Sequence, residues 1–164
     1  MNTQVKDLPV MDYPPLTEDL EEAKGHLDLY GMALIKNVLS ADEVDQMDNR
    51  LTEQFYGEEK FKVGSKVRGD EGFGVESSEE EKVSRLVWNL INKGDCFLKL
   101  IDHPKILPLI QHIIGERVCL CSMGAHMNGS GNERMALHQD QWPLVPHPMK
   151  FPFMANVMYL ISDN

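Results

Sequence analysis

The most informative stretch of the sequence is LHQDQW at residues 137–142. In an extended strand, residues two apart project to the same side, so His138 and Asp140 can present an imidazole and a carboxylate to one metal ion. These groups, joined by a second imidazole from elsewhere, form the facial arrangement of non-haem Fe(II) oxygenases. His-x-Asp alone is a common surface pattern, so its interpretation depends on the surrounding sequence.

The sequence on both sides of this stretch predicts strands. Residues 118–127 have the pattern of a long strand, NGSGN at 128–132 is typical of a turn, and the apolar residues 153–161 predict a second strand. Upstream, residues 32–38 and 83–91 also have strand patterns. Periodicity alone therefore predicts a mixed fold with at least four strands.

Three helices are predicted among these strands. Thr17 can cap the first, which has an acidic first turn, reaches about residue 27 and is broken by Gly31. The second begins with the capping box SADE at 40–43, and the third covers residues 104–114. The apolar stripe of the second helix consists of Val44, Met47, Leu51 and Phe55.

The whole chain, residues 1–164, is predicted to form a single domain. Residues 57–80 are rich in charge and glycine without a period, which predicts a mobile loop within that domain.

Three segments, spread over most of the chain, resemble a known protein family. They are YGMALIKNVLS at 30–40, NLINKG at 89–94 with Phe97 and His103-Pro104 behind it, and LHQDQW at 137–142 leading into NVMYLISDN at 156–164. Together they resemble the phytanoyl-CoA dioxygenase family of Fe(II)/2-oxoglutarate oxygenases, and specifically the N-terminal part of its domain.

This resemblance implies an α+β fold, in which N-terminal helices support an antiparallel double-stranded β-helix of the jelly-roll kind. Such a roll closes with eight strands, and about three are expected after Arg117, so it is expected to be truncated before the barrel closes. In the family, the distal iron histidine and the arginine that pairs with 2-oxoglutarate would follow residue 164. We therefore expect no 2-oxoglutarate turnover from the 164-residue chain itself, and succinate release that His138→Ala abolishes would overturn this expectation.

The implied activity is that of an Fe(II)- and 2-oxoglutarate-dependent dioxygenase, which hydroxylates an unactivated carbon of a small organic substrate. Dioxygen is the co-substrate and ascorbate a candidate reductant. His138 and Asp140 would be the catalytic metal ligands. The carboxylate of Asp140 favours hydroxylation over halogenation, because it fills the position that a halide would otherwise take.

The resemblance also implies residues that bind the cofactors. Met123 and Asn156 would line the 2-oxoglutarate pocket, Arg85 is a candidate second cation for a carboxylate, and Trp142 would form a rigid wall beside the metal. Each has an alternative role in packing or at the surface.

Two other functions stay open on the sequence. One is a catalytically inactive fragment, or a metal-binding or structural module with a jelly-roll sheet. The other is a cupin-like metal protein without 2-oxoglutarate, which would need His126 or His147 as a ligand. A lone strand histidine is more often structural, and prolines on both sides of His147 stiffen the chain there. His103 is expected to cap a helix.

Charge and hydropathy limit the partners. Sixteen basic and 26 acidic residues give a formal net charge of −10, which disfavours nucleic acid and anionic membrane surfaces. No apolar run approaches the roughly 18 residues of a membrane helix, and the N-terminus lacks a signal-peptide pattern. A cytoplasmic location is expected, and the sequence gives no signal of an oligomeric state.

The three cysteines, Cys96, Cys119 and Cys121, make an odd number that does not predict a disulfide framework. Cys119 and Cys121 would share one face of the strand predicted at 118–127, where buried packing is the expected role.

Overall fold

The computed structural model describes residues 13–68, 83–127, 140 and 151–162. Contacts divide the chain into two compact units, Met1–Val38 and Leu39–Asn164. The prediction of a single domain stays a prediction. Among the described residues, no helix is long and apolar enough to cross a lipid bilayer.

The first unit contains one helix and two short parallel strands. β1 (Leu16–Thr17) pairs with β2 (Leu34–Ile35), and α1 (Leu20–Tyr30) lies between them in sequence. α1 ends at Gly31, whose left-handed φ of 72° suits a residue without Cβ, so the predicted break is confirmed. The strand predicted at residues 32–38 is shorter, because β1 offers a partner to two of its residues only.

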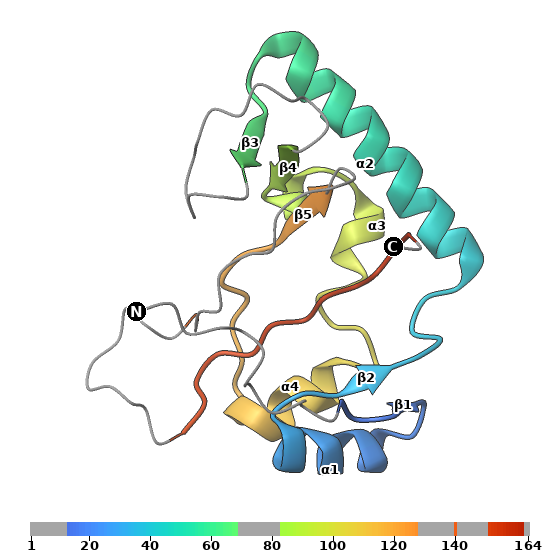
Figure 1. Ribbon diagram of the computed structural model, residues 1–164, viewed down its shortest axis with the longest axis vertical. Coiled ribbons are helices and arrows are strands. Elements are labelled where there is room, and N and C mark those ends of the chain that lie inside the picture. The colour runs from blue at the N-terminus through green and yellow to red at the C-terminus, as the bar shows by residue number, and fades with distance from the viewer. Residues whose placement is uncertain (1–12, 69–82, 128–139, 141–150, 163–164) are drawn as a thin grey trace, which may run out of the picture. The chain divides into compact units, whose positions relative to one another are not determined.

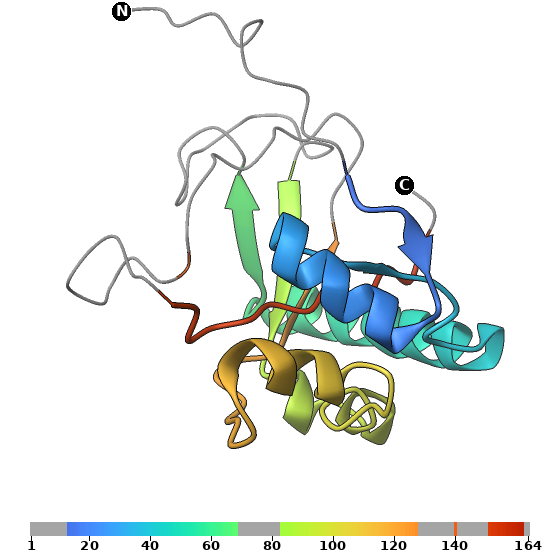
Figure 2. The ribbon, with the colours of Figure 1, turned by 90° about the horizontal axis from the view of Figure 1, so that it is seen from below.

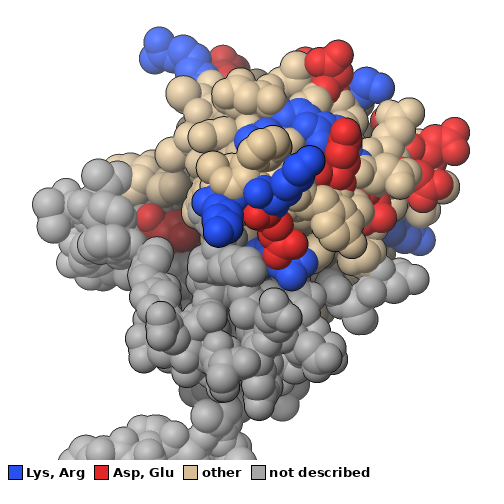
Figure 3. Space-filling model, turned by 90° about the horizontal axis from the view of Figure 1, so that it is seen from above, with Lys and Arg blue, Asp and Glu red and all other residues tan. Residues whose placement is uncertain are grey.

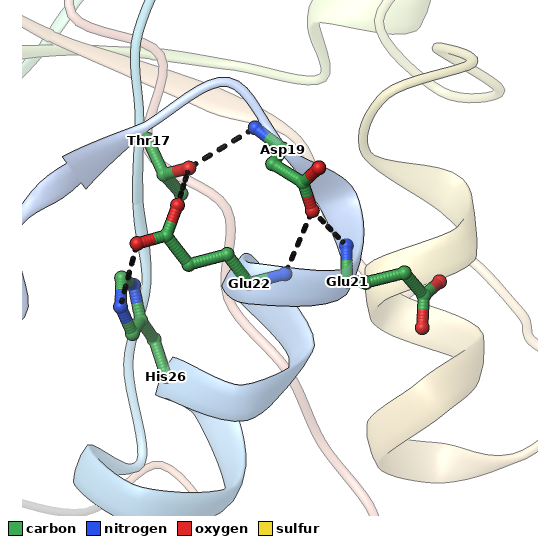
Figure 4. Close-up of polar contacts among 5 residues, drawn as sticks. All are labelled: Thr17, Asp19, Glu21, Glu22 and His26. Carbon is green, nitrogen blue, oxygen red and sulfur yellow. Dashed lines mark hydrogen bonds and ion pairs between the residues drawn. The ribbon is translucent and has the colours of Figure 1, made fainter.

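The start of α1 differs from the prediction, because Asp19 and not Thr17 is the N-cap. Asp19 Oδ1 accepts hydrogen bonds from the backbone N–H groups of Glu21 and Glu22 at 2.8 and 2.9 Å (Figure 4). The Thr17 hydroxyl accepts from the Asp19 N–H at 3.0 Å and donates to Glu22 at 2.5 Å. Both residue types are good caps. Thr17 belongs to β1, which leaves Asp19, next to the first helical residue, to cap the helix.

The predicted capping box of the second helix is confirmed. α2 (Ala41–Phe61) follows Ser40, whose Oγ accepts a hydrogen bond from the Glu43 N–H at 3.3 Å, while Glu43 accepts from the Ser40 N–H at 2.9 Å. These bonds satisfy donors that a helix start leaves unpaired. Hydrogen bonds from Ser40 also lower the pKa of the Glu43 carboxyl.

The prediction of a loop at residues 57–80 is wrong for the part that is helix and strand. α2 continues to Phe61, and β3 (Ser65–Arg68) follows it, while residues 69–80 lie outside the described residues. The helix is extended because two glutamates near its end have partners on other elements, which local sequence cannot reveal. They are Glu58 with Lys93 at 3.2 Å and Glu59 with Arg85 at 3.1 Å.

Three antiparallel strands form the sheet of the second unit, in the order β3-β4-β5. β4 (Val83–Trp88) pairs with β5 (Gly124–Met127), so both strands are shorter than the predicted 83–91 and 118–127. The prediction is wrong over 118–123 because β4 already ends at Trp88, opposite Gly124. Residues before Gly124 therefore have no strand partner in the described structure.

The core of the second unit lies between α2 and this sheet. Figures 1 and 2 show α2 beside the strands. Met47, Leu51 and Phe55 of the predicted stripe are buried in the core, while Val44 is half-buried. The buried cluster consists of Met47, Leu51, Phe55, Val87, Leu90, Phe97 and Leu100. Each such side chain contributes about 1.5–3 kcal/mol when fully buried.

Short helical segments connect β4 to β5. They are the 3₁₀ turn η3 (Leu90–Asn92), α3 (Asp95–Leu98) and α4 (Leu107–Ile114). α4 begins three residues later than predicted, because the His103 carbonyl accepts the N–H groups of Ile106 and Leu107 in a preceding turn, both at 2.9 Å. His103 Nδ1 accepts from the Lys105 N–H at 3.3 Å, so His103 caps this turn and not α4.

The strand predicted at 153–161 is wrong, because no described strand pairs with residues 151–162 (the last coloured segment of Figure 1). Side chains still alternate there: Tyr159 and Ile161 pack against the core, while Met158 and Leu160 are 84% and 71% exposed. The Tyr159 hydroxyl donates to the Leu100 carbonyl at 3.0 Å. The described chain is therefore a mixed fold of helices and two small sheets, without a closed barrel.

Candidate metal and cofactor site

Asp140 and Asn156, both singled out from the sequence, contact each other. Asn156 Nδ2 donates a hydrogen bond to Asp140 Oδ2 at 2.5 Å. Both residues are exposed, and Asp140 lies in a turn. A carboxylate held by a neutral amide keeps its charge and retains lone pairs for another partner. The structure thus joins the predicted metal ligand to one predicted cofactor residue.

Other predicted residues of the site lie outside the described part of the chain. These are His138 and Trp142, together with the alternative ligand His147. Their roles stay predictions.

Arg85 and Met123 are placed beside the core. Arg85 lies on β4, directly before the buried Leu86 and Val87, and its guanidinium pairs with Glu59 on α2. Met123 precedes β5 and packs against the core, and its carbonyl accepts the Leu90 N–H at 3.1 Å. Both placements accord with the alternative roles in packing, and the cofactor roles stay predictions.

His126 lies on β5 opposite Leu86, with Ala125 and Met127 packed against the core on either side of it. Alternation along a strand therefore directs the His126 imidazole to the opposite face of the sheet. Partial burial lowers the pKa of this imidazole, so its neutral form is favoured. A neutral imidazole is the form that ligates metals, and the alternative role of His126 stays open.

Within the described residues, His, Cys, Asp and Glu side chains do not gather in threes that could hold a metal ion. On the face drawn in Figure 3, basic atoms lie beside acidic atoms and not in a patch of their own. Ion pairs of this kind join Lys93 to Glu58 and Arg85 to Glu59.

Tyr159 was missed as a residue that supports the site. Its hydroxyl fixes the chain three residues after Asn156, and burial raises its pKa to about 12. The signal in the sequence is weak: a tyrosine among apolar residues shows neither its partner nor its direction.

Comparison with known proteins places the chain. The family model described as phytanoyl-CoA dioxygenase (PhyH) matches residues 27–164. The chain belongs to the phytanoyl-CoA dioxygenase family. The resemblance noted in the sequence is therefore confirmed.

This family member also matches a curated relative, named Dioxygenase af480, from Aspergillus fumigatus. The two are 26% identical over 147 residues, which cover 90% of this chain and 45% of the relative. The chain thus spans about half the length of the relative that it matches. No solved structure matches this phytanoyl-CoA dioxygenase family chain.

Proposed function

We propose that the chain forms part of an Fe(II)- and 2-oxoglutarate-dependent dioxygenase, which hydroxylates an unactivated carbon of a small organic substrate. Family membership and the name of the Aspergillus relative support an oxygenase. The contact between Asp140 and Asn156 supports the site, because it joins a proposed metal ligand to a proposed cofactor residue. In this proposal the antiparallel sheet β3-β4-β5 belongs to a double-stranded β-helix.

The donors of the site fit an iron ion. Asp140 offers an exposed carboxylate, and metal-ligating carboxylates are themselves hydrogen-bonded by neighbouring groups, as Asp140 is by Asn156. Together with the imidazole of His138 this carboxylate gives the ligand types of the facial arrangement. When bound, iron with 2-oxoglutarate supplies the activation of dioxygen for hydroxylation, while the protein supplies binding and orientation.

The chain's own residues would orient that chemistry. The Asn156 amide holds one oxygen of the Asp140 carboxylate, which restricts the rotation of the side chain. Trp142 would exclude water beside the metal. Arg85, which pairs with Glu59, would have to leave that ion pair in order to bind a cosubstrate carboxylate, and this favours its structural role.

Metal binding tests the proposal directly. We would titrate the chain with Mn²⁺, a redox-stable substitute for Fe²⁺, by isothermal calorimetry, with and without 2-oxoglutarate. Binding should be lost in His138→Ala and Asp140→Ala, and it should be retained in His126→Ala. Because 2-oxoglutarate is a chelating ligand, its presence should raise the affinity for the metal, and the metal should raise the affinity for 2-oxoglutarate equally.

The outcomes separate the candidate functions. Binding that disappears in His126→Ala or His147→Ala would support the cupin-like alternative. Binding that 2-oxoglutarate leaves unchanged would support a metal-binding module, and equal binding by all variants would contradict the proposed site.

A further inference from the structure

Two exposed thiols stand two residues apart in the segment between α4 and β5. Cys119 and Cys121 are both exposed free cysteines, whereas Cys96 is half-buried and packs against the core. The predicted burial of the pair is thus wrong. The predicted burial and the predicted strand are wrong for one reason: in the described structure, residues 117–123 have no strand partner that would cover them.

Chain geometry keeps these two sulfurs within reach of each other. Two residues apart, Cα atoms are separated by roughly 7 Å at most, and a disulfide needs about 4.4–6.8 Å. A strand held in a ladder would keep them near the upper limit, at roughly 6.6 Å. Without ladder hydrogen bonds the backbone can contract to the middle of the range.

The Cys119 side chain is directed along the chain toward its neighbour. Its Sγ donates to the carbonyl of Leu120 at 3.7 Å. That carbonyl belongs to the peptide bond between Leu120 and Cys121, so the Cys119 sulfur lies over the link to the second cysteine.

We propose that Cys119 and Cys121 form a redox-active dithiol, which a peroxide oxidises reversibly to an intramolecular disulfide. The thiolate of one cysteine attacks a peroxide oxygen and the O–O bond breaks, which gives a sulfenic acid and a hydroxide; the hydroxide takes up the proton that the thiol had released and becomes water. The second thiolate attacks the sulfenic sulfur, the S–O bond breaks, and a second water leaves. In balance, two thiols and one hydrogen peroxide give one disulfide and two waters.

Closure of this disulfide would affect the start of β5. Cys121 lies two residues before Met123, whose carbonyl accepts the Leu90 N–H and whose side chain packs against the core. Shortening of the segment around residues 119–121 would therefore pull on Met123 and on the start of β5, which the core holds in place.

Thiol counting with mass spectrometry tests the proposal. The folded chain is treated with hydrogen peroxide, quenched, unfolded and titrated with a thiol reagent. We expect the count to fall from three thiols to one, with an intact mass lower by two hydrogen atoms and a linked peptide containing residues 119 and 121. Dithiothreitol should restore all three thiols.

Three single variants provide the controls. Cys96→Ser should lose both of its remaining thiols, those of Cys119 and Cys121, in the same way as the native chain loses them. Cys119→Ser and Cys121→Ser should form no intramolecular disulfide, and circular dichroism would verify their folding. Three results would each overturn the proposal: the Cys96 thiol is lost at the same rate, disulfides form only between chains, or all three thiols survive peroxide. Each of these results can be measured on the native chain, without any variant.

Discussion

The side-chain amide of Asn156 donates a hydrogen bond to the carboxylate of Asp140, which is 16 residues earlier in the chain. An amide donor bonds to one carboxylate oxygen without neutralising the charge. Asn156 therefore orients the carboxylate without removing its negative charge.

Removal of this amide should weaken metal binding without abolishing it. We expect Asn156→Ala to lower the Mn²⁺ affinity by about 10–100-fold, the usual effect of losing a group that orients a ligand. Calorimetric titration measures this change. Met158→Ala, at an 84% exposed position in the same segment, should bind as the native chain does. Equal losses in both variants would mean that the segment and not the amide matters.

Ser40→Ala should destabilise the chain through α2. The variant loses the side-chain acceptor for the Glu43 N–H, and loss of such an N-cap costs about 1 kcal/mol. Urea denaturation followed by circular dichroism gives the change in the free energy of unfolding. Gln46→Ala, at an exposed position of the same helix, should change it by less than about 0.5 kcal/mol. A Ser40 variant as stable as this control would contradict the role of the cap.

Two glutamates of α2 should differ in their contributions to stability. The Glu58 side chain is 12% exposed and accepts hydrogen bonds from Gln54 and Lys93, at 2.8 and 3.2 Å. Glu53 is 78% exposed and pairs with Arg50 at 3.3 Å. Glu58→Ala leaves two half-buried partners without their acceptor and should cost about 1–3 kcal/mol, whereas Glu53→Ala should cost less than about 1 kcal/mol. Urea midpoints compare the two variants, and similar values would refute the distinction.

Tyr159 should ionise at a higher pH than an ordinary tyrosine. Burial raises its pKa from 10.0 to about 12, so the folded state favours the neutral phenol. The stability that results is fully present below pH 10 and is lost as the pH rises through about 12. Ultraviolet titration should show a step near pH 12 that Tyr159→Phe removes and Tyr56→Phe keeps. The absence of a step near pH 12 in the native chain would contradict this burial.

Tyr159→Phe should also cost about 1 kcal/mol at neutral pH, since the Leu100 carbonyl loses its donor. Tyr56 is 68% exposed, so its replacement by phenylalanine should leave the urea midpoint unchanged.

Local signals were enough to predict some elements of the fold. The capping box at Ser40 and Glu43 spans three residues, and the break at Gly31 depends on one residue, so both could be recognised without knowledge of distant contacts. Strand ends could not, because they depend on pairing. β5 begins at Gly124 since its partner ends at Trp88, and this register is set by residues far apart in the sequence.

The same distinction applies to the site. The resemblance named Asp140 and Asn156 one by one, but their hydrogen bond depends on how the chain returns after residue 140. Arg85 was a candidate cation because of its charge. Its partner Glu59 lies near the end of α2, in a part of that helix that was predicted to be a loop. The exposure of Cys119 and Cys121 likewise could not be predicted, because it depends on β4 ending at Trp88, so that no described strand pairs with residues 119 and 121.

The phenol of Tyr159 fixes which side chains near the end of the last described segment face the core. Neighbouring residues of an extended chain face opposite ways, so holding Tyr159 on the inner side also directs Met158 and Leu160 outward. Asn156 is exposed as well and donates its hydrogen bond to Asp140. The hydrogen bond of Tyr159 to the Leu100 carbonyl thus holds the segment that carries the amide partner of the carboxylate.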